Sequence, residues 1–175
     1  EFSGPNGEIL EVEGYWFEEN IWKIRFMPTT VGDWSFVTVS DDSSLSDISG
    51  RLECVASSRP GLLKVSDSNP HIFELNNEPF FWFGETNWLL MSDAVPFDGT
   101  FQQYINTRKA QHFNGIHFVL GTGGLPIGTD NPSNEGGNLW SSQREQKINP
   151  EFFKWMDERF EYLDDAEFVV GFFMT

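Results

Sequence analysis

Residues 80–88, Phe-Phe-Trp-Phe-Gly-Glu-Thr-Asn-Trp, constrain the fold more than any other stretch of this sequence. Four apolar residues followed by a glycine predict a short strand that is buried on both faces. Proteins with parallel sheets place their ligand chemistry just past the carboxyl ends of such strands. That place holds the carboxylate of Glu85, the polar side chains of Thr86 and Asn87, and the indole of Trp88. Carboxylates accept hydrogen bonds from hydroxyl groups and an indole packs on C–H faces, so these groups suit a sugar ring.

Two further buried strands are predicted, over residues 115–120 and 168–174, and a helix precedes each of them. The first helix is expected near residues 98–112, where apolar side chains recur at helical spacing. The second is expected to begin at residues 149–150, because Asn at the N-cap followed by Pro is a favoured helix start. The order β-α-β-α-β predicts parallel strands joined by right-handed crossovers.

For the first predicted helix, Asp98 or Thr100 is the expected N-cap. The apolar stripe expected on the second helix consists of Phe152, Phe153, Met156, Phe160 and Leu163.

Residues 1–58 show a different pattern, with short alternating segments separated by Gly, Asp and Asn turns. Residues 21–26, 34–39 and 51–55 are the clearest of these predicted strands, and together they favour an antiparallel immunoglobulin-like sandwich. Only about four strands are visible where such a sandwich needs about seven, so we expect this domain to be incomplete at its N-terminus. Residues 59–78 are predicted to form a linker and a hairpin.

Composition excludes several classes of partner. A formal charge of −16 repels phosphate backbones and anionic membranes, so neither nucleic acid nor a membrane surface is an expected partner. No stretch reaches about 18 uninterrupted apolar residues, so no membrane span is expected. The acidity is compatible with a secreted or cell-surface protein. Eighteen Phe and seven Trp exceed the needs of a core this small, so we expect some rings to face a ligand.

The sequence predicts no metal site and no cofactor. Cys54 is the single cysteine, and the three histidines lack the spacing of a His-based metal centre. Asp130-Asn131 and Asn134-Glu135 offer oxygen atoms to a calcium ion, but their spacing differs from that of an EF-hand loop.

Two more residues are candidates for sugar binding. His117 lies within the predicted strand 115–120, where it either packs in the interior or points toward the sugar. Trp140 lies in a long Gly-, Pro- and Asn-rich segment, residues 121–148, that is predicted to be a loop. Loops of this length are often functional, so Trp140 is a candidate for the wall of a binding cleft. The predicted substrate-binding set is therefore Glu85, Asn87, Trp88, His117 and Trp140.

Three motifs resemble those of bacterial polysaccharide-degrading proteins in which an immunoglobulin-like domain of unknown function precedes an apiosidase-like (β/α)8 glycoside hydrolase domain. Residues 14–16, 22–28 and 32–36 are similar to the pattern G-F-Y … W-x-V-R-F-x-P … G-x-W-x-Y of the first domain. Residues 79–88 are similar to P-F-F-x-L-G-D-T-A-W, the first barrel strand, and residues 104–116 to Y-L-x-x-R-x-x-x-G-F-N-x-I.

The resemblance implies a fold and an activity. Residues 1–58 would form the partial sandwich, and residues 79–175 would form the first β-α-β-α-β part of a TIM barrel whose remainder comes from the same parent chain or from other copies. The parent would be a glycoside hydrolase that acts on a polysaccharide or oligosaccharide. Its catalytic carboxylates would follow later strands, beyond residue 175, so we expect the 175-residue chain alone to be inactive. Glu85 stands where the family usually has Asp, and Asn87 where it has Ala, which leaves the sugar open.

Two other hypotheses remain open from the sequence. The aromatic excess and the predicted sandwich also suit a non-catalytic carbohydrate-binding module. The incomplete ends also suit a surface assembly protein whose sheet edges are completed by other chains.

Overall fold

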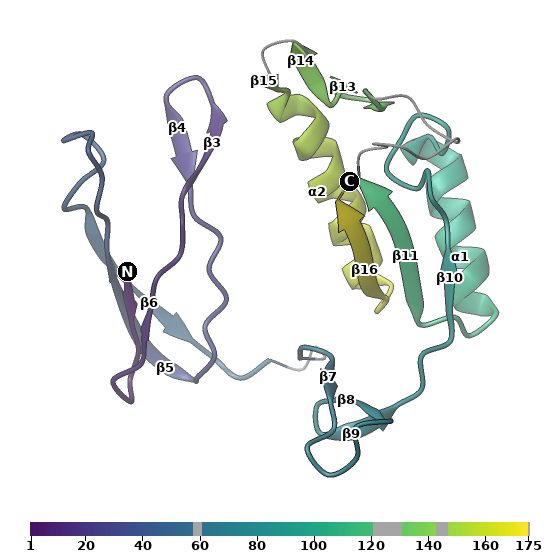
Figure 1. Cartoon of the computed structure of the whole chain (residues 1–175), viewed down its shortest axis with the longest axis horizontal. Coiled ribbons are helices and arrows are strands. Elements are labelled where there is room, and N and C mark those ends of the chain that lie inside the picture. Colours follow the sequence, from purple (N-terminus) through teal and green to yellow (C-terminus); the bar gives the residue numbers. More distant parts are fainter. Residues whose placement is uncertain (58–60, 121–130, 143–146, 175) are drawn as a thin grey trace. The chain divides into compact units, whose positions relative to one another are not determined.

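The computed structural model of the 175-residue chain describes residues 1–57, 61–120, 131–142 and 147–174. The chain divides into two compact units, Glu1–Arg59 and Pro60–Thr175, which we call the first and second units and describe separately. The first unit is all β, whereas the second combines small sheets with two helices (Figure 1).

A four-stranded antiparallel sheet forms the centre of the first unit. Its order is β2-β1-β5-β6, with β1 at Phe2–Ser3, β2 at Ile9–Leu10, β5 at Gly32–Val37 and β6 at Ser49–Cys54. Six residue pairs join β5 to β6, which makes this the longest ladder of the unit. The sequence patterns predicted β5 and β6 but missed β1, which has only two residues and no alternation to reveal it.

The core of this unit is a small aromatic cluster. Trp34 on β5 is 1% exposed, and Phe2 on β1 is 5% exposed. Phe26 stacks on Phe2, with ring centroids 3.7 Å apart, and meets Trp34 edge-on at 5.1 Å. The indole N–H of Trp34 donates to the carbonyl of Thr30 at 2.8 Å, which satisfies the one polar group that this ring buries.

A separate hairpin in the first unit joins β3 (Tyr15–Glu18) to β4 (Ile21–Lys23). The strand predicted over residues 21–26 is therefore correct only in its first half. Trp16 and Trp22 are cross-strand partners on this hairpin and are 37% and 53% exposed. Antiparallel pairing is observed throughout the unit, but the immunoglobulin-like sandwich stays a prediction.

The second unit opens with a three-stranded antiparallel sheet of β7 (Lys64–Val65), β8 (Phe73–Leu75) and β9 (Glu78–Phe80). The predicted hairpin is confirmed: Asn76 and Asn77 form the two-residue turn between β8 and β9. Both have positive φ angles, 54° and 63°, a conformation that Asn tolerates better than most residues.

A parallel sheet of three strands organises the rest of the second unit. Its order is β10-β11-β16, with β10 at Gly84–Thr86, β11 at Gly115–Leu120 and β16 at Val169–Met174 (Figure 1). The parallel pairing that the β-α-β-α-β order predicted is confirmed. Whether these strands belong to a TIM barrel stays a prediction.

The prediction of a buried strand at residues 80–83 is wrong. The parallel strand begins at Gly84, and Phe81 and Phe83 are 80% and 43% exposed. The side chain of Asn114 bonds to the backbone of this segment in place of a strand: its Oδ1 accepts from Phe83 N and its Nδ2 donates to Phe81 O, both at 2.8 Å. Phe80 belongs to the antiparallel strand β9 instead.

Helix α1 spans Gln102–Ala110 and helix α2 spans Pro150–Asp165. The predicted start of α2 is confirmed, because the side chain of Asn149 accepts from Glu151 N and Pro150 is the first helical residue. The predicted capping of α1 is wrong. An irregular turn, η1 at Phe97–Phe101, precedes α1, and no side chain caps either element.

No helix in the described part of the chain is long and apolar enough to cross a membrane.

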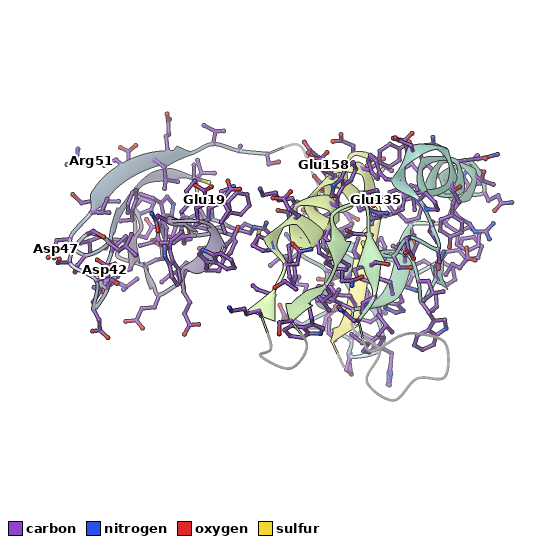
Figure 2. The ribbon with its side chains drawn as sticks, turned by 90° about the horizontal axis from the view of Figure 1, so that it is seen from above. Glu19, Asp42, Asp47, Arg51, Glu135 and Glu158 are labelled. Carbon is purple, nitrogen blue, oxygen red and sulfur yellow. The ribbon has the colours of Figure 1, made fainter. Side chains whose placement is uncertain are left out.

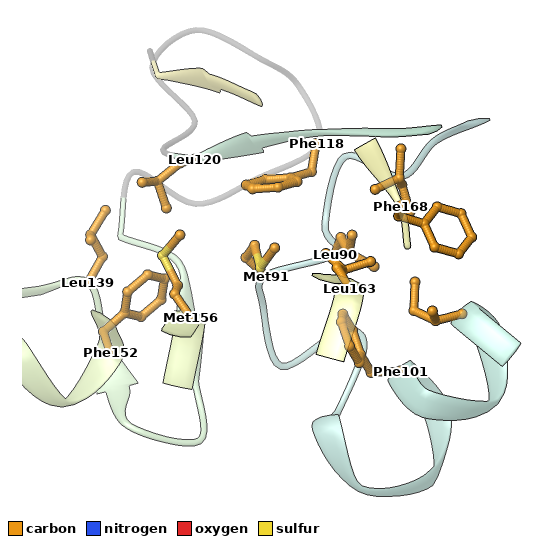
Figure 3. Packing of buried hydrophobic residues seen from close by; sticks show 12 residues of the cluster. Leu90, Met91, Phe101, Phe118, Leu120, Leu139, Phe152, Met156, Leu163 and Phe168 are labelled. Carbon is orange, nitrogen blue, oxygen red and sulfur yellow. The ribbon is translucent and has the colours of Figure 1, made fainter. Parts of the chain in front are cut away.

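The main core lies between the parallel sheet and the two helices (Figure 3). Ile116 and Phe118 on β11 are fully buried in it, and Leu120 is 8% exposed. Side chains alternate along a strand, so these residues define the helix-facing side of β11, and Gly115, His117 and Val119 must face the other side. The helices contribute apolar side chains that include Ile105, Phe152, Met156 and Leu163.

Replacement of Asn114 by Ala tests the role of its amide. The variant loses both bonds to residues 81–83, so we expect the free energy of unfolding to fall by about 2 kcal/mol, at about 1 kcal/mol for each bond. Urea titration of the two proteins measures this difference. Asn106→Ala, at an exposed position of α1, is the control and is expected to change stability by less than about 0.5 kcal/mol.

Candidate functional site

The carboxyl ends of the parallel strands carry the candidate site. Trp88 follows β10 by two residues and is 44% exposed. It lines a hollow of about 20 Å³ together with Val119 and Leu120, at the carboxyl end of β11, and Pro132. The structure therefore places this indole at the end of the sheet where the sequence pattern predicted it.

Asn87 organises the turn that presents Trp88. Its backbone N–H donates to the carbonyl of His117 at 2.8 Å, which continues the ladder between β10 and β11. Its side-chain oxygen accepts from Leu89 N at 3.2 Å, and its carbonyl accepts from Leu90 N. These contacts are those of a turn residue, and a contact of Asn87 with sugar stays a prediction.

Glu85 on β10 forms an ion pair with Arg108 on α1. Arg108 on α1 donates through Nε to Glu85 Oε2 and through Nη2 to Oε1, the second bond at 2.9 Å. Glu85 is in register with Ile116, so it shares the helix-facing side of the sheet. The observed contacts tie β10 to α1, and a role of Glu85 in sugar binding stays a prediction.

Tyr104 lies beside this pair, one helical turn before Arg108. Its hydroxyl is buried and has no hydrogen-bond partner among the described residues. Burial raises the pKa of Tyr104, and the nearby carboxylate of Glu85 raises it further, so the phenol stays neutral at physiological pH.

His117 lies on the opposite side of the sheet from Glu85. Its ring stacks on Trp82, with centroids 4.8 Å apart, and it lies beside Gly171, where a Cβ atom would come within 2.3 Å of the imidazole. His117 and Trp82 line a cavity of about 650 Å³ with Phe73 and the start of β16. The structure does not bring His117 together with Trp88, and a sugar contact by His117 stays a prediction.

Trp140 lies in a segment that is more ordered than the predicted loop. Within the described part of residues 121–148, β12 (Ser133–Asn134) pairs with β13 (Gly137–Asn138), and β14 (Trp140–Ser142) pairs with β15 (Lys147–Ile148). The prediction of a loop without secondary structure is therefore wrong for this part.

The backbone of Trp140 is held by the side chain of Asn131. The amide oxygen of Asn131 accepts from Trp140 N at 2.7 Å, and its amide nitrogen donates to Trp140 O at 3.0 Å. Trp140 packs against the main core, and Asn131 is the neighbour of Pro132, which lines the hollow beside Trp88. The segments that carry the two predicted tryptophans therefore meet at Asn131 and Pro132.

A second ion pair, which the sequence analysis missed, joins Arg159 on α2 to Glu135 in the turn between β12 and β13 (Figure 2 labels Glu135). The side chain of Arg159 is fully buried, and that of Glu135 is 26% exposed. The sequence does indicate that Arg159 is buried, because it has the helical spacing of Phe152, Met156 and Leu163 and therefore lies on the apolar face of α2.

Three of the four residues considered for calcium, Asn131, Asn134 and Glu135, form hydrogen bonds with protein groups. Asn134 donates to Phe152 O and accepts from Gly136 N, and Glu135 accepts from Phe97 N at 2.5 Å as well as from Arg159. Asp130 lies outside the described residues. No group of three potential metal ligands occurs within the described ranges.

The ion pair of Glu135 predicts a dependence of stability on pH. Burial alone would raise the pKa of Glu135, but the hydrogen bonds from Arg159 and from Phe97 N outweigh it and lower the pKa below the ordinary 4.5. A carboxylate with a lowered pKa stabilises the fold above its unfolded-state pKa, and this contribution disappears as the pH falls through the folded-state pKa.

We expect Glu135→Gln to lower the free energy of unfolding by about 2 kcal/mol at pH 7, because Arg159 stays buried without its anionic partner. The difference between the variant and the native protein should shrink as the pH falls from about 5 to about 3. Urea titrations across this range measure it. A difference that does not change with pH would contradict the assignment.

Two family models match parts of this chain. Residues 66–175 match the family model described as apiosidase-like, catalytic domain, and residues 1–41 match that of a domain of unknown function, DUF5060. A comparison with curated protein sequences finds no match.

A solved structure shares the fold. It is the crystal structure of a candidate glycoside hydrolase from Bacteroides vulgatus ATCC 8482, with a TM-score of 0.70 and 20% sequence identity. The alignment covers 93% of this chain and 34% of that chain, so the present chain spans about a third of the length of its structural relative. Because the catalytic-domain match extends over more than half of its residues, the chain belongs to the apiosidase-like family of glycoside hydrolases.

Proposed function

We propose that this chain is part of a secreted or cell-surface glycoside hydrolase that cleaves glycosidic bonds in a complex polysaccharide. The observation that carries the proposal is the match of residues 66–175 to a catalytic domain of glycoside hydrolases. The strong negative charge is compatible with an extracellular location.

The arrangement of the second unit supports a place in a TIM barrel. Its three parallel strands are separated by helices, and the indole of Trp88 follows the carboxyl end of the first, which is the end where barrel enzymes bind substrate. In this proposal β10, β11 and β16 are the first three barrel strands. The first unit is the accessory immunoglobulin-like domain that precedes the barrel.

The chemistry of the proposed enzyme needs two carboxylic acids. One protonates the oxygen of the glycosidic bond, and the other attacks the sugar or activates a water molecule. The resemblance assigns neither group to residues 1–175, and Glu85 is already paired with Arg108. The role proposed for the described residues is therefore to bind and orient the sugar, with Trp88 and Trp140 as stacking surfaces.

The family description directs the choice of sugar. The matching model is named for apiosidases, so we propose a terminal apiose residue on a polysaccharide as the first substrate to test. An apolar ring face bounded by hydroxyl groups suits an indole beside hydrogen-bonding side chains.

The test is hydrolysis by the full-length protein. It is incubated with plant and algal polysaccharides, apiose-bearing ones included, and released sugars are separated and identified. Release of a monosaccharide or oligosaccharide supports the proposal. A folded full-length protein that releases nothing from a broad panel counts against it.

One observation favours a second candidate, a non-catalytic carbohydrate-binding module. Trp16 and Trp22 are exposed on one face of the hairpin of β3 and β4 in the first unit. If this face binds sugar, Trp22→Ala weakens the retention of the full-length protein on insoluble polysaccharide. Binding that depends on Trp22, without any hydrolysis, would favour this candidate over the enzyme.

Truncation of Trp88 tests the proposed binding face. Loss of a half-exposed indole that stacks on a sugar should cost about 2 kcal/mol of binding, so Trp88→Ala should raise KM roughly 30-fold. Steady-state kinetics of the full-length protein measure it. The matched control is Phe81→Ala, which removes an 80% exposed ring before the amino end of β10 and should leave KM within about twofold.

A further inference from the structure

Arg159 has an environment that a merely stabilising side chain would not require. Its guanidinium is fully buried and makes two ion-pair contacts with Glu135, Nη1 to Oε2 at 2.8 Å and Nη2 to Oε1 at 2.9 Å. Nη2 also donates to the carbonyl of Val95 at 3.2 Å. The rings of Phe97 and Phe101 lie 5.6 and 5.4 Å from its central carbon. One side chain of α2 therefore contacts the turn between β12 and β13 and the segment that leads into α1.

Glu135, in the turn between β12 and β13, also contacts the segment that leads into α1. Besides its bonds to Arg159, it accepts from the backbone N–H of Phe97 at 2.5 Å. Nearby, the side chains of Asp93 and Ser133 are hydrogen-bonded, and Asp93 N donates to Ser133 O at 2.7 Å. The segment after β10 and the segment after β11 are thus joined by a continuous set of polar contacts.

The two joined segments carry Trp88, which is 44% exposed, and Trp140, which is partly buried. Trp88 lies five residues before Asp93, and Trp140 is bonded to Asn131, two residues before Ser133. A shift of one segment against the other would move the two indoles relative to each other. The contacts of Arg159 and Glu135 join these two segments.

Stability alone does not account for an ion pair at this place. Removing a guanidinium from water is costly, and an apolar pair of similar volume is often as stable as a buried ion pair. Arg159 Nε is moreover buried without a hydrogen-bond partner among the described residues. The ion pair adds a fixed orientation of the two groups, because the planar guanidinium of Arg and a carboxylate bind each other in one geometry.

We propose that Arg159 and Glu135 are positioning residues that hold the two segments after β10 and β11 in one arrangement and thereby set the spacing of Trp88 and Trp140. The proposal rests on the proposed function, since these indoles are its sugar-binding surfaces. Neither residue touches the sugar in this proposal.

The experiment compares three forms of the full-length protein. Arg159→Met leaves the carboxylate of Glu135 without its partner. The double variant Arg159→Met, Glu135→Leu replaces the ion pair by an apolar pair. The control is the exposed ion pair of Lys109 and Glu167, which lie 2.8 Å apart in the same unit and are replaced by Met and Leu. Hydrogen–deuterium exchange, thermal unfolding and, with the polysaccharide that the native enzyme cleaves, kcat and KM are measured.

The apolar double variant separates positioning from stability. We expect its midpoint of thermal unfolding to lie within about 4 °C of the native value, because an apolar pair replaces the ion pair at little cost. We expect peptides from residues 87–96 and 131–142 to exchange at least ten times faster, while α1 and β11 keep their protection. KM should rise about tenfold with kcat changed less than threefold. The control should match the native protein in all of these measurements.

Two results would overturn the proposal. If the apolar double variant exchanges and binds like the native protein, the ion pair does not position the segments. If protection falls equally across the second unit, its role is general stability. A native protein that cleaves no polysaccharide refutes the proposed function instead, and the exchange data then still decide whether the pair orders the two segments.

Discussion

The alternation of side chains along β11 is the constraint on which the arrangement of the second unit depends. Ile116, Phe118 and Leu120 face the helices, so Glu85 on β10 and Val170 and Phe172 on β16, which are in register with Ile116 and Phe118, face the helices too. Glu85 is opposite Ile116 and meets Arg108 on α1, whereas Thr86 is opposite His117 on the other side. A register shift of one residue would exchange these two environments.

The two sides of the sheet consequently have different chemistry. The helix-facing side is apolar, and two ion pairs enter it: Glu85 with Arg108, and Arg159 with Glu135. The other side carries the stacked rings of Trp82 and His117 and an apolar cavity. Of the predicted sugar-binding residues, Glu85 lies on the helix-facing side and His117 on the other. The indole that follows β10 lies instead at the carboxyl end of the strands, where both sides meet the connecting segments.

Local chemistry made some elements predictable. The turn at Asn76 and Asn77 and the start of α2 at Asn149 each depend on a few neighbouring residues, so the sequence pattern was sufficient for them. The start of β10 was not predictable in this way, because it depends on the side chain of Asn114, about thirty residues away. An apolar run signals burial, but residues 81–83 form hydrogen bonds with the distant Asn114 and the rings of Phe81 and Phe83 are exposed.

In the candidate site, too, neighbouring residues were predictable and distant contacts were not. That Trp88 follows a parallel strand can be inferred from the chain alone, whereas the partner of Glu85 depends on the register between β10 and β11 and on the packing of α1. Arg159 could have been noticed, because it occupies an apolar position of its helix. Its partner could not, since Glu135 lies in a turn between two strands of only two residues each.

Those short strands also explain why directional contacts matter here. Strands of two or three residues form few ladder bonds, and such small sheets are marginal on their own. Apolar burial would hold them against the core but would tolerate sliding, because the hydrophobic effect has no preferred direction. A buried guanidinium that binds a carboxylate in a fixed geometry, and a backbone carbonyl as well, does not tolerate sliding. The cost of burying Arg159 is therefore consistent with a segment whose position, more than its stability, matters to the protein.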